Sequence, residues 1–168
     1  MEAMRAAIAQ LVYLSPTRHL MYMTRTFNGD PDGTMQHLTC FFPGLFALSN
    51  YLLPDSVYMP GEKQVFEYVA EGLANTCYIL YADSLTGLGP EEVRFQPYKG
   101  VDDYESGRWI HHLQKWERRT SRKSIKPPGL QTPVPRRRGK ADSRPKDYKY
   151  TYRHWRCRPE VCGHAYTF

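Results

Sequence analysis

The sequence predicts a mainly α-helical domain with short extended segments and one basic insertion. Three observations support this prediction. In several segments, apolar residues recur at alternating steps of three and four, which is the spacing of one face of a helix. Clusters of proline and glycine separate these segments. The chain has 168 residues, 41% hydrophobic and 14% aromatic, which is enough apolar material for the core of a globular domain.

The first expected helix covers residues 1–13. Its apolar side chains share one face: Met4, Ile8, Leu11 and Val12. Ser15 and Pro16 end this helix, because the residue before a proline disfavours the helical conformation. Residues 19–26 (HLMYMTRT) alternate loosely and are rich in strand formers, so we expect a short extended segment before the turn at residues 28–33.

The central helix of the prediction covers Gln36–Leu52. Its apolar residues form one stripe that we expect to build core: Leu38, Phe41, Leu45, Leu48 and Leu52. Pro43 is tolerated near the start, because first-turn N–H groups have no helical partner. His37 and Cys40 lie at the head of this helix, where one end is free to do chemistry.

A further helix is expected from Glu62 to Ala82, with a second stripe: Val65, Val69, Leu73, Cys77 and Leu80. A short connection joins it to the central helix, so the two should pack antiparallel. That arrangement places Cys40 beside Cys77. The spacing allows two states: a disulfide stabilising the fold by about 3–4 kcal/mol in an oxidising compartment, or two buried free thiols.

Residues 83–93 (DSLTGLGPEEV) follow as a loop. Gly87 and Gly89 allow the backbone to bend sharply, which would present Glu91 and Glu92 at the mouth of the helical bundle. The alternative is an ordinary polar loop. The next expected helix covers Arg108–Arg119, with Trp109, Leu113 and Trp116 at helical spacing and basic residues opposite.

The net charge of +6 is concentrated in the second part of the chain. Residues 121–147 are rich in proline and arginine and hold hardly any large apolar residue, so we expect a solvated, disordered insertion. Such a segment, with the tyrosines that follow it, could also contact nucleic acid. A Pro-rich charged loop is more often only solvated, and we expect no nucleic-acid partner.

Four metal-binding residue types lie near the C-terminus: His154, Cys157, Cys162 and His164. The C-x₄-C spacing is loose for a zinc site, so we expect no zinc there. No apolar run has the length of a membrane span, and residues 1–14 have the pattern of an amphipathic helix rather than of a secretory signal. Any targeting information is expected to be absent or to lie outside this chain.

Five motifs occur in the order and approximate spacing of one known family: LVYLSPTRHLMYMT, HLTCFFPGLFAL, ANTCYILY, TGLGPEEV and RPEV. The chain therefore resembles the class I α-1,2-mannosidases of glycoside hydrolase family forty-seven. The resemblance covers nearly the whole chain, and residues 109–116 and 127–129 look like an insertion of fungal members. It divides the chain into a helical part (1–107), the insertion (108–147) and a return to the family pattern with an aberrant C-terminus (148–168).

The resemblance implies a partial (α/α)₇ barrel of antiparallel helix pairs and a calcium ion whose protein ligand is expected outside this chain. It also implies removal of α-1,2-linked mannose from high-mannose N-glycans with inversion, in the lumen of the endoplasmic reticulum or Golgi. In an inverting mechanism, one carboxyl group protonates the leaving oxygen and another activates a water, and the two stand roughly 6.5–9.5 Å apart.

Site residues follow from the matched motifs. Glu160 matches the proposed base, Glu91 a carboxylate that binds sugar hydroxyls, and His37 a histidine near the catalytic water. Arg158 matches the arginine that neutralises the acidic site. Cys40 and Cys77 match the family's disulfide.

The chain also departs from the family pattern. Where the family continues with Glu-Ser after the Arg-Pro-Glu motif and two further residues, this chain has Gly163 and His164. The matching positions of the family's acid and of its calcium-binding threonine lie before Met1 and after Phe168. We therefore expect an internal fragment of a mannosidase that is inactive alone. The alternative is a non-catalytic module that binds mannose or handles glycoproteins.

Overall fold

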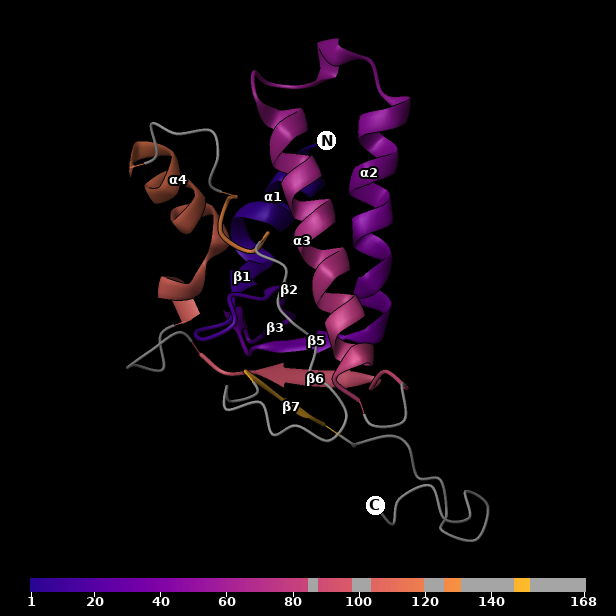
Figure 1. Cartoon of the computed structure of the whole chain (residues 1–168). Helices are drawn as coiled ribbons and strands as arrows, with labels where there is room; N and C mark the ends of the chain where they lie inside the picture. Colours follow the sequence, from indigo (N-terminus) through magenta and orange to yellow (C-terminus); the bar gives the residue numbers. More distant parts are fainter. Residues whose placement is uncertain (85–87, 98–103, 120–125, 131–146, 152–168) are drawn as a thin grey trace, which may run out of the picture.

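The computed structural model describes residues 1–84, 88–97, 104–119, 126–130 and 147–151 (Figure 1). Within these ranges the chain forms four α-helices: α1 (Glu2–Leu11), α2 (Phe42–Leu52), α3 (Glu62–Ala82) and α4 (Trp109–Arg119). The short strands are β1 (Val12–Leu14), β2 (Met21–Met23), β3 (Thr26–Phe27), β4 (Asp30–Pro31), β5 (Thr34–Gln36), β6 (Glu92–Phe95) and β7 (Tyr148–Tyr150). The predicted helices are present, but the antiparallel sheets make the described fold mixed rather than purely helical.

Helices α2 and α3 lie side by side and run in opposite directions, as predicted (Figure 1). The disulfide between Cys40 and Cys77 joins the pair at one end, with Cα atoms 6.0 Å apart. Toward the other end, the Asn50 side-chain amide donates a hydrogen bond to the Lys63 carbonyl over 2.8 Å. The disulfide is thus confirmed, and the alternative of two free thiols is wrong.

The predicted burial of α3 is confirmed and that of α2 is wrong. In α3, Val69, Leu73 and Leu80 are buried. The stripe expected to build core around α2 is instead exposed, each side chain at between 48% and 74%: Leu38, Phe41, Leu45, Leu48 and Leu52. The helix packs through its other side, where the Phe46 ring meets the Phe66 ring of α3 edge-on, with ring centres 5.3 Å apart.

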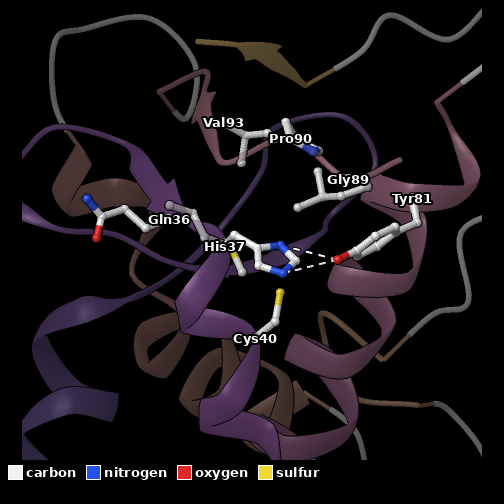
Figure 2. A pocket seen from close by; sticks show the side chains of 9 residues that line it. Gln36, His37, Cys40, Tyr81, Gly89, Pro90 and Val93 are labelled. Atoms are coloured by element: carbon white, nitrogen blue, oxygen red, sulfur yellow. Dashed lines mark hydrogen bonds between the residues drawn. The ribbon is translucent and has the colours of Figure 1, made fainter. Parts of the chain in front are cut away.

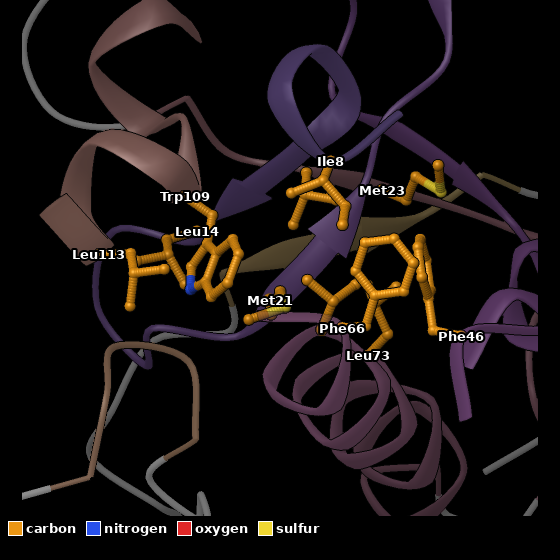
Figure 3. Packing of buried hydrophobic residues seen from close by; sticks show 11 residues of the cluster. Ile8, Leu14, Met21, Met23, Phe46, Phe66, Leu73, Trp109 and Leu113 are labelled. Atoms are coloured by element: carbon orange, nitrogen blue, oxygen red, sulfur yellow. The ribbon is translucent and has the colours of Figure 1, made fainter. Parts of the chain in front are cut away.

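The main core lies where α1, β1, β2, α3 and α4 meet (Figure 3). It contains Ile8, Leu14, Met21, Met23, Phe46, Phe66, Leu73, Trp109 and Leu113, among others. Gly72 allows β2 to lie close to α3, because a Cβ at this position would come within 2.6 Å of the Met21 side chain. Helix α3 is therefore the central element of the described fold.

The N-terminal segment is shorter as a helix than predicted. Helix α1 ends at Leu11, and Val12 and Tyr13 belong to β1, which pairs with β2 in antiparallel register. β-branched and aromatic residues favour strands, and β1 is buried along its whole length, which explains the earlier end of the helix. The extended segment predicted at residues 19–26 is confirmed in β2.

Part of the expected disordered insertion is buried or half-buried, so the prediction is wrong for residues 127–130 and Asp147. The Trp109 indole N–H donates to the Pro128 carbonyl over 2.8 Å, and Leu130 is buried beside the core. Asp147 is fully buried. Scarce apolar residues were still sufficient here because they pack against a core that the rest of the chain supplies. Most other residues of the insertion lie outside the described ranges.

A second core lies at the three-stranded antiparallel sheet, with strand order β5-β6-β7. In Figure 1 this sheet lies across the end of the α2–α3 pair. Strand β5 pairs with β6 so that Gln36 faces Glu92. Sequence reasoning missed this sheet and treated residues 83–93 as one loop. The pairing matters because it brings the segment before α2 next to the segment after α3.

Candidate functional site

A small pocket lies where the α2–α3 pair meets the three-stranded sheet (Figure 2). Its lining comes from β5 and the following turn, from the last part of α3, and from the segment that enters β6: Met35, Gln36, His37, Cys40, Leu80, Tyr81, Gly89, Pro90 and Val93. Two of these side chains, His37 and Cys40, were singled out from the sequence. The pocket therefore forms at the helix head where chemistry was expected.

Backbone pairing places His37 beside Glu91. The His37 N–H donates to the Glu91 carbonyl over 2.7 Å, which extends the pairing of β5 with β6 by one residue. The Gln36 side-chain amide reinforces this edge by donating to the Glu92 carboxylate over 3.1 Å. A histidine and an acidic segment far apart in the sequence thus meet at one edge of the sheet.

The two neighbouring glutamates have different surroundings. The Glu92 carboxylate accepts from Gln36 and lies 3.5 Å from the Arg25 guanidinium, so it is engaged within the fold. Glu91 is exposed, and its carboxylate makes no hydrogen bond or ion pair with another described residue. Because a solvated carboxylate can accept hydrogen bonds from donors in solution, Glu91 is the one of the two that is accessible to a ligand.

The His37 ring is held by Tyr81, which sequence reasoning missed. The Tyr81 hydroxyl lies 3.1 Å from Nε2 and 3.3 Å from Nδ1 of His37 (Figure 2). The two rings meet edge-on with centres 5.7 Å apart. A signal was present in the sequence: Tyr81 follows Cys77 by four residues, so both point from the same side of α3.

Gly89 leaves room for the Tyr81 ring. A Cβ atom on Gly89 would lie 2.7 Å from Cζ of Tyr81, closer than non-bonded carbon atoms approach. Gly89, which was expected to let the backbone bend, therefore also leaves space for a neighbouring ring. It allows the Pro90–Glu91 segment to pass directly over the tyrosine.

The pocket is too small for a sugar ring. The space open to the centre of a water molecule is about 10 Å³. A volume of roughly 10–15 Å³ measured in this way holds a single water. The pocket that the described residues form therefore has room for about one water molecule.

A buried polar cluster fixes the end of α3, and sequence reasoning missed it too. The Arg18 guanidinium pairs with the Asp83 carboxylate, which also accepts from the Tyr148 hydroxyl over 2.7 Å. Burial by itself lowers the pKa of Arg18, but the hydrogen bond and the charge of Asp83 raise this pKa above its ordinary value overall. Burial, followed by the hydrogen bond to Asp83, raises the pKa of Tyr148.

Asp147 extends this cluster to the turn between β1 and β2. Its carboxylate accepts from the backbone N–H of Arg18 over 2.6 Å and of Thr17 over 3.2 Å. The Ser15 hydroxyl donates to the same oxygen over 2.5 Å. Together with the Asp83 contacts, these bonds fix the start of β7. The Arg158-Pro159-Glu160 motif follows β7 in the sequence.

Several predicted site residues cannot be located. Glu160 and Arg158 lie outside the described residues, as do the zinc candidates His154, Cys157, Cys162 and His164. Within the described ranges, no three His, Cys, Asp or Glu side chains gather closely enough to hold a metal ion. The described residues therefore do not fit a calcium site. None of the described helices has both the length and the apolar content needed to cross a membrane.

Comparison with known proteins gives consistent matches. The family model described as "Glycosyl hydrolase family 47" matches residues 1–167. The chain is 36% identical over 93 residues to mannosyl-oligosaccharide alpha-1,2-mannosidase IA of Spodoptera frugiperda. It is 39% identical over 70 residues to mannosyl-oligosaccharide alpha-1,2-mannosidase 1B of Emericella nidulans. It is 31% identical over 97 residues to the endoplasmic reticulum mannosyl-oligosaccharide 1,2-alpha-mannosidase of Homo sapiens.

These matches cover much of this chain and little of each relative. The aligned part is 55% of this chain and 13% of the Spodoptera frugiperda protein. The corresponding shares are 42% and 12% for the Emericella nidulans protein, and 58% and 13% for the Homo sapiens protein. The chain therefore spans a small part of the length of the curated relatives that it matches.

Proposed function

Because the chain belongs to glycosyl hydrolase family 47, we propose that it is an internal part of an α-1,2-mannosidase that trims high-mannose N-glycans with inversion. The observation that carries this proposal is the family match over residues 1–167. The geometry adds support, since two residues of separate family motifs, His37 and Glu91, are neighbours through a 2.7 Å backbone hydrogen bond.

The proposed roles follow the chemistry of inversion. Glu160 removes a proton from the attacking water, while His37 lies beside that water and helps to orient it. Glu91 accepts hydrogen bonds from sugar hydroxyls, and Arg158 offsets the negative charge of the site. Inversion requires a second carboxyl group as the acid, roughly 6.5–9.5 Å from the base. Since no residue of this chain matches that acid, we propose that the chain alone does not hydrolyse glycans.

The exposed face of α2 supports the proposal of a partial (α/α)₇ barrel. Helix α2 contains no charged residue, and its exposed stripe is apolar along its whole length. A contiguous apolar surface of this kind marks a contact site. In an (α/α) barrel, the next helix pair would cover it. The small pocket fits the same interpretation, because further barrel loops would complete the sugar site.

The compartment is proposed on chemical grounds. Disulfides persist in oxidising compartments and are rare in the cytosol. The bond between Cys40 and Cys77 therefore supports the lumen of the endoplasmic reticulum or Golgi, where high-mannose N-glycans are processed. A calcium ion, which the family resemblance implies, is part of the same proposal, with its protein ligand expected outside this chain.

A second candidate is a non-catalytic module that binds mannose. The exposed Glu91 carboxylate favours it, because this group can bind sugar hydroxyls without a catalytic acid. Incubating the isolated chain with a high-mannose N-glycan and calcium separates the two proposals. Saturable binding without release of mannose supports the binding module, whereas absence of both binding and release supports the incomplete hydrolase.

The hydrolase proposal is tested directly in a chimera. Residues 34–97 of this chain replace the corresponding segment of the Spodoptera frugiperda relative, and release of mannose from a high-mannose N-glycan is measured. We expect the chimera to be active. Glu91→Gln should lower kcat/KM by about ten- to a hundredfold, the effect of losing a hydrogen bond to a charged group. His37→Ala should lower kcat by about a hundredfold or more.

Glu92→Gln is the matched control for Glu91. Glu92 lies next in the sequence but is occupied by Gln36 and Arg25, so its substitution should change kcat/KM less than about threefold. Equal losses for the two glutamates would contradict the assignment of sugar binding to Glu91. A folded chimera that releases no mannose would contradict the proposed function as a whole.

A further inference from the structure

We propose that Tyr81 is a positioning residue that sets the orientation and tautomer of the His37 ring. The contact itself is observed in the described structure, whereas its value for catalysis rests on the proposed function. Both nitrogens of the imidazole face the Tyr81 hydroxyl, at 3.1 and 3.3 Å. Nε2 is the nearer nitrogen and a phenolic hydroxyl is a better donor than acceptor, so donation to Nε2 favours the tautomer that carries its proton on Nδ1.

Two contacts between the same two segments hold this arrangement. His37 and Cys40 are three residues apart in the 3₁₀ turn η1 (His37–Phe41), which has three residues per turn, so they share one side. Cys77 and Tyr81 are four residues apart in α3 and share one side of that helix. The disulfide joins one pair, and the hydrogen bond joins the other.

The disulfide restricts where His37 and Tyr81 can lie relative to each other. Because the bond between Cys40 and Cys77 fixes the 3₁₀ turn on the last turns of α3, His37 lies beside the side chain one helical turn beyond Cys77. That side chain is Tyr81. On its other side, the tyrosine ring lies against Gly89, where a Cβ would come within 2.7 Å of it. The ring is thus confined between the histidine and the segment leading to Glu91.

The backbone provides a third link. The His37 N–H is bonded to the Glu91 carbonyl, so the position of the histidine main chain is set independently of Tyr81. Removing only the hydroxyl should leave the main chain in place and release the ring. Tyr81→Phe is therefore a clean test of positioning, because phenylalanine keeps the aromatic contact and lacks the hydroxyl.

The test uses the 168-residue chain with its disulfide intact. Long-range ¹⁵N–¹H NMR at alkaline pH reports the ratio of the two neutral tautomers of His37. Tyr81→Phe should shift this ratio by about two- to tenfold, the range that one neutral hydrogen bond supports. Tyr78→Phe is the matched control, because Tyr78 is on the same helix but 62% exposed and makes no hydrogen bond or ring contact with His37 in the described structure.

A second variant disturbs the same contact without removing the hydroxyl. Gly89→Ala keeps the hydroxyl but forces the Tyr81 ring to move, so it should shift the tautomer ratio as well. The thermal midpoint and the His37 amide shift show whether each variant remains folded. An unchanged tautomer ratio in folded Tyr81→Phe, or an equal shift in Tyr78→Phe, would overturn the proposal.

This readout is independent of glycan chemistry. If the chimera releases no mannose but the tautomer ratio shifts, the proposed function fails and the positioning contact stands. If the chimera is active and the ratio does not shift, the positioning role fails alone.

Discussion

Helices α2 and α3 carry similar apolar stripes, and the fold treats them in opposite ways. The stripe of α3 is buried, since α3 contacts α2, β2 and η1. The stripe of α2 is exposed, because α2 packs on α3 through Phe46 on its other side. Apolar periodicity therefore shows which face of a helix is apolar. The neighbouring elements decide whether that face is buried.

The largest expected effect concerns the bond that joins the two helices. Replacing both Cys40 and Cys77 by alanine should lower the free energy of unfolding by about 4 kcal/mol, because the bond closes a loop with a sequence separation of 37. Urea unfolding measures this change. Wild-type protein in a reducing agent serves as the control and should show a similar loss. A loss below about 1 kcal/mol would mean that other contacts hold α2 against α3.

A matched pair of leucines sharpens the comparison itself. Leu73→Ala in α3 should cost about 2–5 kcal/mol, because the side chain is fully buried in the main core. Leu48→Ala in α2 should stay within about 0.5 kcal/mol, because the side chain is half exposed. Both values come from the same unfolding experiment. Equal costs would show that the α2 stripe is buried in solution.

The polar anchor at the end of α3 should have an intermediate effect. Tyr148→Phe removes a 2.7 Å hydrogen bond to the buried carboxylate of Asp83. Bonds to charged groups contribute about 1.5–3 kcal/mol, so we expect a loss in that range in chemical unfolding. Tyr51→Phe, at an exposed tyrosine of α2, is the control and should change little. An unchanged free energy of unfolding in Tyr148→Phe would mean that β7 does not help to anchor α3.

The smallest expected effect is at the start of α3. Arg5 of α1 donates to the Glu62 carboxylate over 2.6 Å, and this hydrogen bond lowers the pKa of Glu62. Because the pKa of Glu62 is lower in the folded state, ionised Glu62 stabilises the fold at pH values above the ordinary glutamate pKa. This contribution is lost as the pH falls through the lowered pKa. The thermal midpoints of wild-type and Glu62→Gln should therefore differ slightly at pH 7 and converge as the pH falls through the lowered pKa of Glu62. A constant difference would contradict the ion pair.

Local patterns were sufficient for the helices. The bounds of α3 agree with the prediction from Glu62 to Ala82, because a long amphipathic segment between turns has few alternatives. The same logic placed α4 at Trp109–Arg119 with one residue of difference. Within the central segment, His37–Phe41 forms a 3₁₀ turn before α2 begins, a distinction that apolar spacing alone does not make.

The site was predictable only in part. The disulfide partners followed from antiparallel packing together with the family resemblance, and the meeting of His37 with the Glu91 segment was expected at one end of the pair. The strand pairing that achieves it was missed, because β5 and β6 have three and four residues and lie far apart in the sequence. The cluster of Arg18, Asp83 and Tyr148 was missed for the same reason, since its partners have no local signal.

In the proposed barrel, a neighbouring helix pair covers the exposed apolar face of α2. The most direct measurement compares Leu48→Glu in the isolated chain and in the mannosidase chimera. We predict an unchanged free energy of unfolding for the isolated chain, and a chimera that loses its thermal stability and its release of mannose, because the new carboxylate would be buried without a partner. A Leu48→Glu chimera as stable and as active as the unsubstituted chimera would contradict the claim.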